Sequence, residues 1–393
     1  MEIVKTMTKE ESRKWYMVFH KKRTWVLILI PISLLILWIV RSNTQIAEYV
    51  FARGVYKWLS QGLSLLTGIL PFSVMEVEII VLPILAIAIV IHFFWRLSHR
   101  KDKKQSDLAY LLMEGILNTA CTLSILLFLF VNLAGVNYYR YPFATYSGLE
   151  IRKSTVEELY DLSLDLAKDA AEIRTQLQIQ DVEADEYGVL KQSNTSWREV
   201  SNTAQKSFKK LSEEYPVLGG YYGSPKPVLF SRLMSKMEIT GIFWPFTMEA
   251  NVNVDATSYS VPATMSHELA HLRGFMREDE ANFIAYLACK QSDSLEFQYS
   301  GIMLALSYAS NQLYQQDEAL YQQVVDTYDT GMLADLREEY YYWKQFEDTV
   351  ISTVSNAVNN NYLKANNQND GVKSYGRMVD LLLAEYRKSH LLE

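Results

Sequence analysis

Two histidines and a glutamate form the part of the sequence best suited to chemistry. His267, Glu268 and His271 match the pattern H-E-x-x-H within residues 262–275, a stretch rich in good helix formers. Histidines four positions apart lie on one face of a helix, so both imidazoles can bind one zinc ion without distorting the backbone. Glu268 lies next to that face, where its carboxylate could take a proton from zinc-bound water and later pass it to a leaving amine.

A pair of histidines on a buried helix face, without any metal, is the alternative explanation of this pattern. Two buried imidazoles would each need hydrogen-bond partners of their own. None of the four residues before His267 is charged, and neither is either residue between Glu268 and His271. The helix can therefore be buried beneath a site, and we favour the metal-binding interpretation.

A third protein ligand is needed, because a catalytic zinc usually has three and keeps its fourth position for water. The only other histidine in the second part of the chain is His390, near its end. A carboxylate is therefore the more economical third ligand. Gly274 can end the first helix and let the chain double back, and a second helix would then begin near Arg277.

Two glutamates at the start of that second helix are candidates for the third ligand. Glu278 would share a helical face with small residues that allow close approach of the first helix, namely Ala281, Ala285 and Ala288. Glu280 points elsewhere on an ideal helix, so we rank Glu278 first and Glu280 second. Acidic residues are also favoured in the first turn of any helix, where no metal is required.

These residues resemble the gluzincin class of zinc peptidases, in which a second helix supplies a glutamate ligand and an Asp or Asn four residues later supports the site. Glu278 and Asn282 fit that spacing. The chain departs from the usual pattern in having Asn282 where Asp is commoner and in its short gap between His271 and the glutamate. The metzincin class would need a ligand at Arg277, and arginine cannot bind zinc, so membership of that class is unexpected.

A second resemblance extends over nearly the full length of the chain. It rests on three apolar runs in the first 136 residues, on residues 241–253, on the motif helix with residues 277–283, and on residues 363–365 and 370–375. These features are similar to a bacterial membrane-protein family of unknown function (domain of unknown function 3810). That resemblance implies an architecture rather than a substrate.

Three further places could contribute to a peptidase site. Tyr375 could donate a hydrogen bond to the oxyanion of a tetrahedral intermediate. Residues 250–254 alternate like a strand and lie where zinc peptidases commonly place an edge strand that pairs with an extended substrate, although any sheet strand would show this pattern. Glu249 could bind a substrate amine, but we favour its interpretation as a solvated surface residue.

Three apolar runs precede the motif in the chain, at residues 24–40, 77–95 and 116–136. Each is nearly free of charge and close to the roughly 20 residues that a helix needs to cross a bilayer. Basic clusters precede the first run and separate the second from the third, and the positive-inside rule predicts that both clusters are cytoplasmic. Three crossings would place residues 137–393 outside the cytoplasm. A signal peptide is the alternative for the first run, but no small-residue cleavage site follows it.

The remaining sequence predicts a mixture dominated by helices. Residues 41–76 combine apolar and basic residues, as in a loop that contains an interfacial amphipathic helix. Strand-like segments are confined to residues 228–254. Cys121 and Cys289 are the only cysteines, so we expect no disulfide. A net charge of −7, without a basic block after residue 137, gives no reason to expect nucleic-acid binding.

The sequence thus predicts a mainly α membrane protein, with three transmembrane helices in residues 1–136 and an α+β zincin-like metallopeptidase domain with a small sheet in residues 137–393. We expect it to use Zn²⁺ to hydrolyse peptides or proteins at the outer surface of the lipid bilayer, and the sequence gives no indication of an oligomeric state. A zincin-like sensor that binds a ligand without hydrolysis is one alternative. A structural membrane protein is another, but a purely structural site would not need Glu268 as a base.

Overall fold

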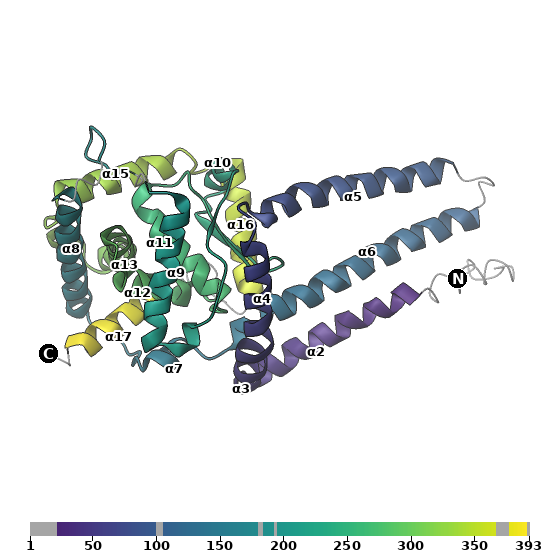
Figure 1. The fold of residues 1–393 in the computed structure, drawn as a ribbon, viewed down its shortest axis with the longest axis horizontal. Helices are drawn as coiled ribbons and strands as arrows, with labels where there is room; N and C mark the ends of the chain where they lie inside the picture. The colour runs from purple at the N-terminus through teal and green to yellow at the C-terminus, as the bar shows by residue number, and fades with distance from the viewer. Residues whose placement is uncertain (1–21, 100–104, 180–183, 192–194, 367–376, 391–393) are drawn as a thin grey trace.

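Three long apolar helices project side by side from a mainly helical protein (Figure 1). The computed structural model describes residues 22–99, 105–179, 184–191, 195–366 and 377–390. The projecting helices run over Arg23–Ser42, Val74–Ser98 and Leu108–Leu133, and each is long and apolar enough to cross a membrane. The expectation of three such helices is confirmed, whereas their orientation across a membrane stays a prediction.

The third of these helices starts and ends earlier than the predicted run at residues 116–136. Glu114, whose charge excluded it from that run, lies within the helix and forms ion pairs with Arg23 and Arg96, each at 3.3 Å. Such pairing lowers the cost of a carboxylate in a membrane helix. In chain order the elements of this part are η1 (Lys22–Ile28), α2 (Leu29–Ser42), α3 (Thr44–Ile46), η2 (Ala47–Tyr56), α4 (Lys57–Gly68), α5 (Val74–Ser98), α6 (Gln105–Leu133) and η3 (Gly135–Tyr139).

The segment from α3 to α4 crosses the base of the long helices (Figure 1). One side of it is apolar and exposed, and Trp58 is 74% exposed there. The other side packs on the rest of the protein, where the buried Tyr56 hydroxyl donates to the backbone oxygens of His271 and Leu272. The amphipathic helix predicted within residues 41–76 is therefore present, and it is also part of the protein core.

The remaining helices surround α11 and α12, which carry the motif. In chain order they are α7 (Ala144–Ser147), α8 (Val156–Ile179), α9 (Trp197–Glu214), η4 (Pro216–Leu218), α10 (Ser231–Lys236), η5 (Ser258–Ser260), α11 (Val261–Leu272), α12 (Glu278–Lys290), α13 (Leu295–Gln316), α14 (Glu318–Val325), α15 (Thr330–Lys344), α16 (Val350–Ala365) and α17 (Met378–His390). Helix α13 packs along both α8 and α12, and α9 packs against α11 and α12. Leu133 and Ala134, at the end of α6, belong to the same hydrophobic core as these helices. This core therefore contains residues from both sides of residue 136, the predicted boundary between the membrane part and the second part of the chain.

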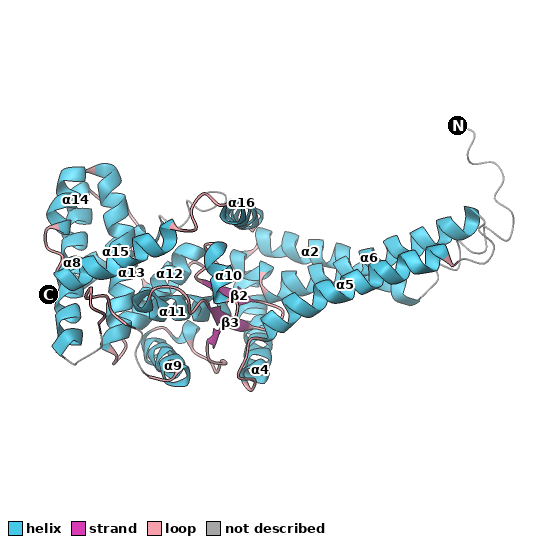
Figure 2. Cartoon of the chain, turned by 90° about the horizontal axis from the view of Figure 1, so that it is seen from above, coloured by secondary structure: helices cyan, strands magenta, loops and turns pink. Residues whose placement is uncertain are grey.

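A small sheet lies between α11 and the base of α5 (Figure 2). Its strands are β1 (Lys226–Pro227), β2 (Gly241–Trp244) and β3 (Glu249–Val252), in the order β1-β3-β2. Strand β3 pairs in parallel with β1 and antiparallel with β2, with Trp244 opposite Glu249. The expectation of an edge strand at residues 250–254 is wrong, because β3 is paired on both sides and fully buried. The edge next to α11 is β2.

Glu249 is buried, which contradicts its interpretation as a solvated residue. Its carboxylate accepts hydrogen bonds from the Val74 and Met75 backbone N–H groups at 3.1 and 2.9 Å, and it pairs with the Lys226 ammonium group. The positive end of the α5 dipole and the buried ammonium group both stabilise this charge. The Glu76 carboxylate of α5 in turn accepts hydrogen bonds from two backbone N–H groups that follow β1. The sheet is therefore fastened to the start of a membrane-type helix.

Candidate metal centre

The motif helix α11 ends in a tight turn that brings α12 back alongside it. Pro262 lies in its first turn, where the missing N–H costs no hydrogen bond. Gly274 has a φ of +86°, and the turn allows the Phe275 N–H to donate to the Ala270 oxygen at 3.1 Å. A Cβ at Gly274 would lie 3.0 Å from the Tyr56 ring. Backbone conformation and close packing therefore both require glycine there.

The structure brings His267, His271 and Glu278 together. The Nε2 atom of His267 lies 3.2 Å from one Glu278 oxygen, and the Nε2 atom of His271 lies 3.6 Å from the other. One ligand atom from each residue lies within 4.8 Å of the other two. Three atoms bound at ordinary distances around one tetrahedral zinc ion would be about 3.3 Å apart. The arrangement therefore has a size that suits a single metal ion.

A neutral oxygen at the Nδ1 atom of each imidazole fixes the orientation of its ring. The Nδ1 atom of His267 lies 2.7 Å from Asn282 Oδ1, and the Nδ1 atom of His271 lies 2.7 Å from the Phe275 oxygen. An oxygen acceptor places the proton on Nδ1 and leaves Nε2 able to bind a metal. The Asn282 amide is itself oriented, because its Nδ2 donates to the Tyr308 hydroxyl at 3.1 Å.

His271 and Glu278 form a largely buried ion pair. Burial lowers the pKa of His271, but the Glu278 carboxylate outweighs this effect and raises the pKa to about 9. Burial would raise the pKa of Glu278, but the two imidazoles more than offset it and hold the pKa well below its usual range. His271 is therefore protonated and Glu278 ionised at neutral pH.

Glu268 lies beside this group, against the edge strand. It is 3% exposed, and its Oε2 atom has no hydrogen-bond partner within the described part of the chain. A Cβ at Gly241 of β2 would come within 2.5 Å of its Oε1 atom, so glycine there lets the strand approach. Burial raises the pKa of Glu268, although the imidazoles of His267 and His271 oppose the rise. The raised pKa makes this carboxylate a stronger base than an exposed glutamate.

Glu280, the second candidate for the third ligand, does not join this group. Glu280 Oε1 accepts from the Phe143 N–H at 2.8 Å, and its Oε2 accepts from Arg277 Nε at 3.0 Å, so both oxygens are used elsewhere. Tyr375 lies outside the described residues. Sequence reasoning missed Tyr308, because it comes from α13 and carries no local signal. It also missed Gly241, whose role depends on the sheet.

Comparison with known proteins gives one finding. The family model described as Protein of unknown function (DUF3810) matches residues 51–383. The matched region includes α5, α6, the sheet and all the residues of the candidate metal centre. No curated protein and no solved structure matches the chain.

Proposed function

The chain belongs to the DUF3810 family of proteins of unknown function, and we propose that it is a membrane-anchored, zinc-dependent metallopeptidase. One observation carries the proposal. The Nε2 atoms of His267 and His271 and the carboxylate of Glu278 converge, with the buried carboxylate of Glu268 beside them. Two imidazoles and one carboxylate form a common ligand set of catalytic zinc sites.

The charges of the site fit a divalent cation. Two neutral imidazoles with the carboxylates of Glu278 and Glu268 carry two negative charges, which a Zn²⁺ ion would neutralise. When bound, zinc would polarise a peptide carbonyl and lower the pKa of a water molecule. His267 and His271 would be held in place by Asn282 and by the Phe275 oxygen, as supporting groups do in known zinc sites.

Glu268 is the proton carrier in this proposal. Its free Oε2 atom would accept a proton from the attacking water and then donate it to the leaving nitrogen. The apolar surroundings that raise its pKa make the protonated form accessible. The nearby Gly241 leaves space for this carboxylate.

A peptide substrate is supported by the edge position of β2. The outer side of this strand is not paired with another strand of the sheet. Edge strands of this kind can bind an extended peptide through backbone hydrogen bonds. The sheet is also joined to the start of α5 through Glu249. We therefore infer that cleavage takes place close to the membrane surface, outside the cytoplasm according to the positive-inside rule.

A comparison of the wild type with Glu268→Gln tests the proposal. The full-length chain in nanodiscs would be incubated with a peptide library, and cleavage followed by mass spectrometry, while bound zinc is measured in parallel. Glu268→Gln should keep zinc and folding but lower cleavage by about 10²-fold or more, because it removes the general base. Glu280→Gln is the matched control and should cleave like the wild type.

Equal cleavage by the wild type and Glu268→Gln, with zinc bound to both, would rule out the proposed mechanism. If both variants bind zinc and neither cleaves any peptide, the chain is better explained as a zincin-like sensor. That alternative uses the same ligand residues without hydrolysis.

A further inference from the structure

A cavity of about 360 Å³ lies next to the C-terminal end of α11, apart from the candidate metal centre. Four cationic side chains line it, and no carboxylate does: Arg53, Lys57, Arg140 and Arg273. The rest of the lining is apolar or phenolic and includes Tyr146, Tyr215 and Tyr222. A cavity with this lining attracts anions.

Protein carboxylates balance only a small part of this charge. Glu48 accepts from Arg53 at 2.7 Å and pairs with Arg140 at 3.1 Å. Within the described residues it is the only carboxylate that forms an ion pair with any of the four cations. One negative charge therefore faces four positive charges. Two of the four cations, Arg140 and Arg273, are buried, and buried charges are costly unless they are paired.

Arg273 is the clearest case of an uncompensated cation. It is 5% exposed, and in the described part of the chain all hydrogen bonds of its guanidinium group go to neutral oxygens, on Leu218, Leu269 and Gln205. Its guanidinium lies 4.0 Å from the Phe208 ring centre and 4.6 Å from that of Tyr222. These contacts fix its position but supply no negative charge. A guanidinium stays charged at all physiological pH values.

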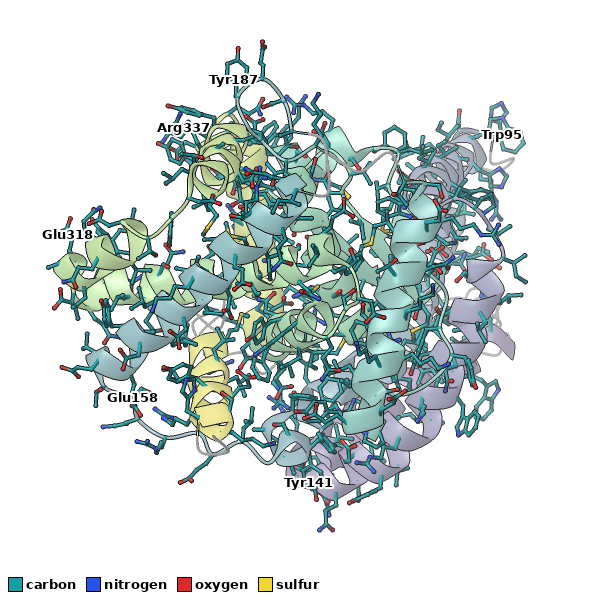
Figure 3. All side chains as sticks on the ribbon, turned by 60° about the vertical axis from the view of Figure 1, so that its left-hand side comes forward. Trp95, Tyr141, Glu158, Tyr187, Glu318 and Arg337 are labelled. Carbon is teal, nitrogen blue, oxygen red and sulfur yellow. The ribbon has the colours of Figure 1, made fainter. Side chains whose placement is uncertain are left out.

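The cavity lies at the base of the membrane-type helices. Arg53 lies in η2 and Lys57 at the start of α4, both of which come after the long helix α2 in the chain. Arg140 comes directly after η3, which follows the long helix α6. Trp58, the residue after Lys57 in α4, is exposed. Tyr141 lies at the edge of the protein beside the N-terminal helices (Figure 3), and its ring meets that of Tyr49 edge-on. Aromatic residues of this kind are typical of the headgroup level of a bilayer.

We propose that this cavity binds a phosphate group, carried either by a phospholipid headgroup or by free phosphate. Guanidinium groups match the oxygens of phosphate, and those of Arg140 and Arg273 are already held in place by buried contacts. The site is independent of the proposed peptidase chemistry. It adjoins the motif helix, because Arg140 Nη1 donates to the Arg273 oxygen at 3.2 Å.

Thermal unfolding of the full-length chain in an uncharged detergent tests the proposal. Sodium phosphate, compared with sodium chloride at equal ionic strength, should raise the unfolding midpoint of the wild type until the site is saturated. Lys57→Gln removes a half-buried cation of the lining and should raise the Kd for phosphate about tenfold. This variant is preferred to Arg273→Gln, which could unfold because Arg273 is buried.

Arg41→Gln is the matched control. Arg41 is an exposed cation at the end of α2, so the variant loses the same charge at the base of the long helices without altering the cavity lining. It should respond to phosphate like the wild type. An equal response of Lys57→Gln and Arg41→Gln, or no response of the wild type to phosphate or to lipid, would overturn the proposal.

Nanodiscs distinguish the two sources of phosphate. If the ligand is a lipid headgroup, the wild type should be more stable in nanodiscs that contain phosphatidylglycerol than in phosphatidylcholine alone, and Lys57→Gln should lose this difference. Free phosphate should then add nothing in phosphatidylglycerol nanodiscs. If the ligand is free phosphate, it should stabilise the wild type equally in both kinds of nanodisc.

Discussion

Replacement of Glu278 by glutamine should change the protonation of His271 in the metal-free protein. The pKa of His271 is about 9, against an ordinary value of 6.5, because the Glu278 carboxylate outweighs the effect of burial. In Glu278→Gln the effect of burial is opposed only by the Glu268 carboxylate and the Phe275 backbone oxygen, so the pKa should fall from about 9 toward the ordinary value of 6.5. One pKa unit corresponds to about 1.4 kcal/mol, so a change of more than two units reports an interaction of roughly 3 kcal/mol.

Carbon-13 NMR of the labelled histidine rings, recorded during a pH titration of the full-length chain in detergent, measures this pKa. The chain has only six histidines, and His271→Gln identifies the resonance. Glu280→Gln is the control and should leave the pKa of His271 near 9, because Glu280 bonds to Phe143 and Arg277 instead. A pKa that stays near 9 in Glu278→Gln would show that this carboxylate does not face the imidazole.

Three further predictions concern the metal and the fold. Zinc binding should release about one proton at pH 7.5 and about half a proton at pH 9, because the pKa of His271 is about 9 and its imidazole must be neutral to bind metal. Calorimetry at pH 7.5 in buffers of different ionisation enthalpy measures this release, and equal heats in all buffers would contradict it. Asn282→Ala should weaken zinc binding about 10- to 100-fold, because the His267 ring loses the hydrogen bond that orients it. An unchanged Kd for zinc, measured in competition with a chelator, would refute the orienting role of Asn282. Asp335→Ala should cost about 3–5 kcal/mol of unfolding free energy, because it leaves the fully buried Arg174 unpaired; chemical denaturation tests this, and a loss below about 1 kcal/mol would be inconsistent with a buried pair.

The parts of the site that depend on local helix geometry could be predicted from the sequence. The spacing of His267 and His271 fixes their common face, because four residues make about one helical turn. The same periodicity ranked Glu278 above Glu280, and the structure places only Glu278 beside the imidazoles. Asn282 was expected as a supporting residue from the resemblance to gluzincins, and it contacts His267.

The parts that depend on contacts between distant segments could not be predicted. The alternation of residues 250–254 indicates a strand. It does not reveal that this strand, β3, pairs with β1 on one side and with β2 on the other. Glu249 was expected to be solvated because its partners, Lys226 and the first turn of α5, lie far away in the sequence. The start of the third long helix was misplaced for the same reason, since Glu114 is compensated by Arg23 and Arg96.

The proposal that three side chains hold one zinc ion is tested most directly by counting bound zinc. Elemental analysis of the purified full-length chain should give about one zinc per chain for the wild type and for Glu280→Gln. Glu278→Gln should retain much less, while its thermal unfolding shows that it is still folded. A wild type without zinc, or equal zinc in Glu278→Gln and Glu280→Gln, would contradict the assignment of the metal centre.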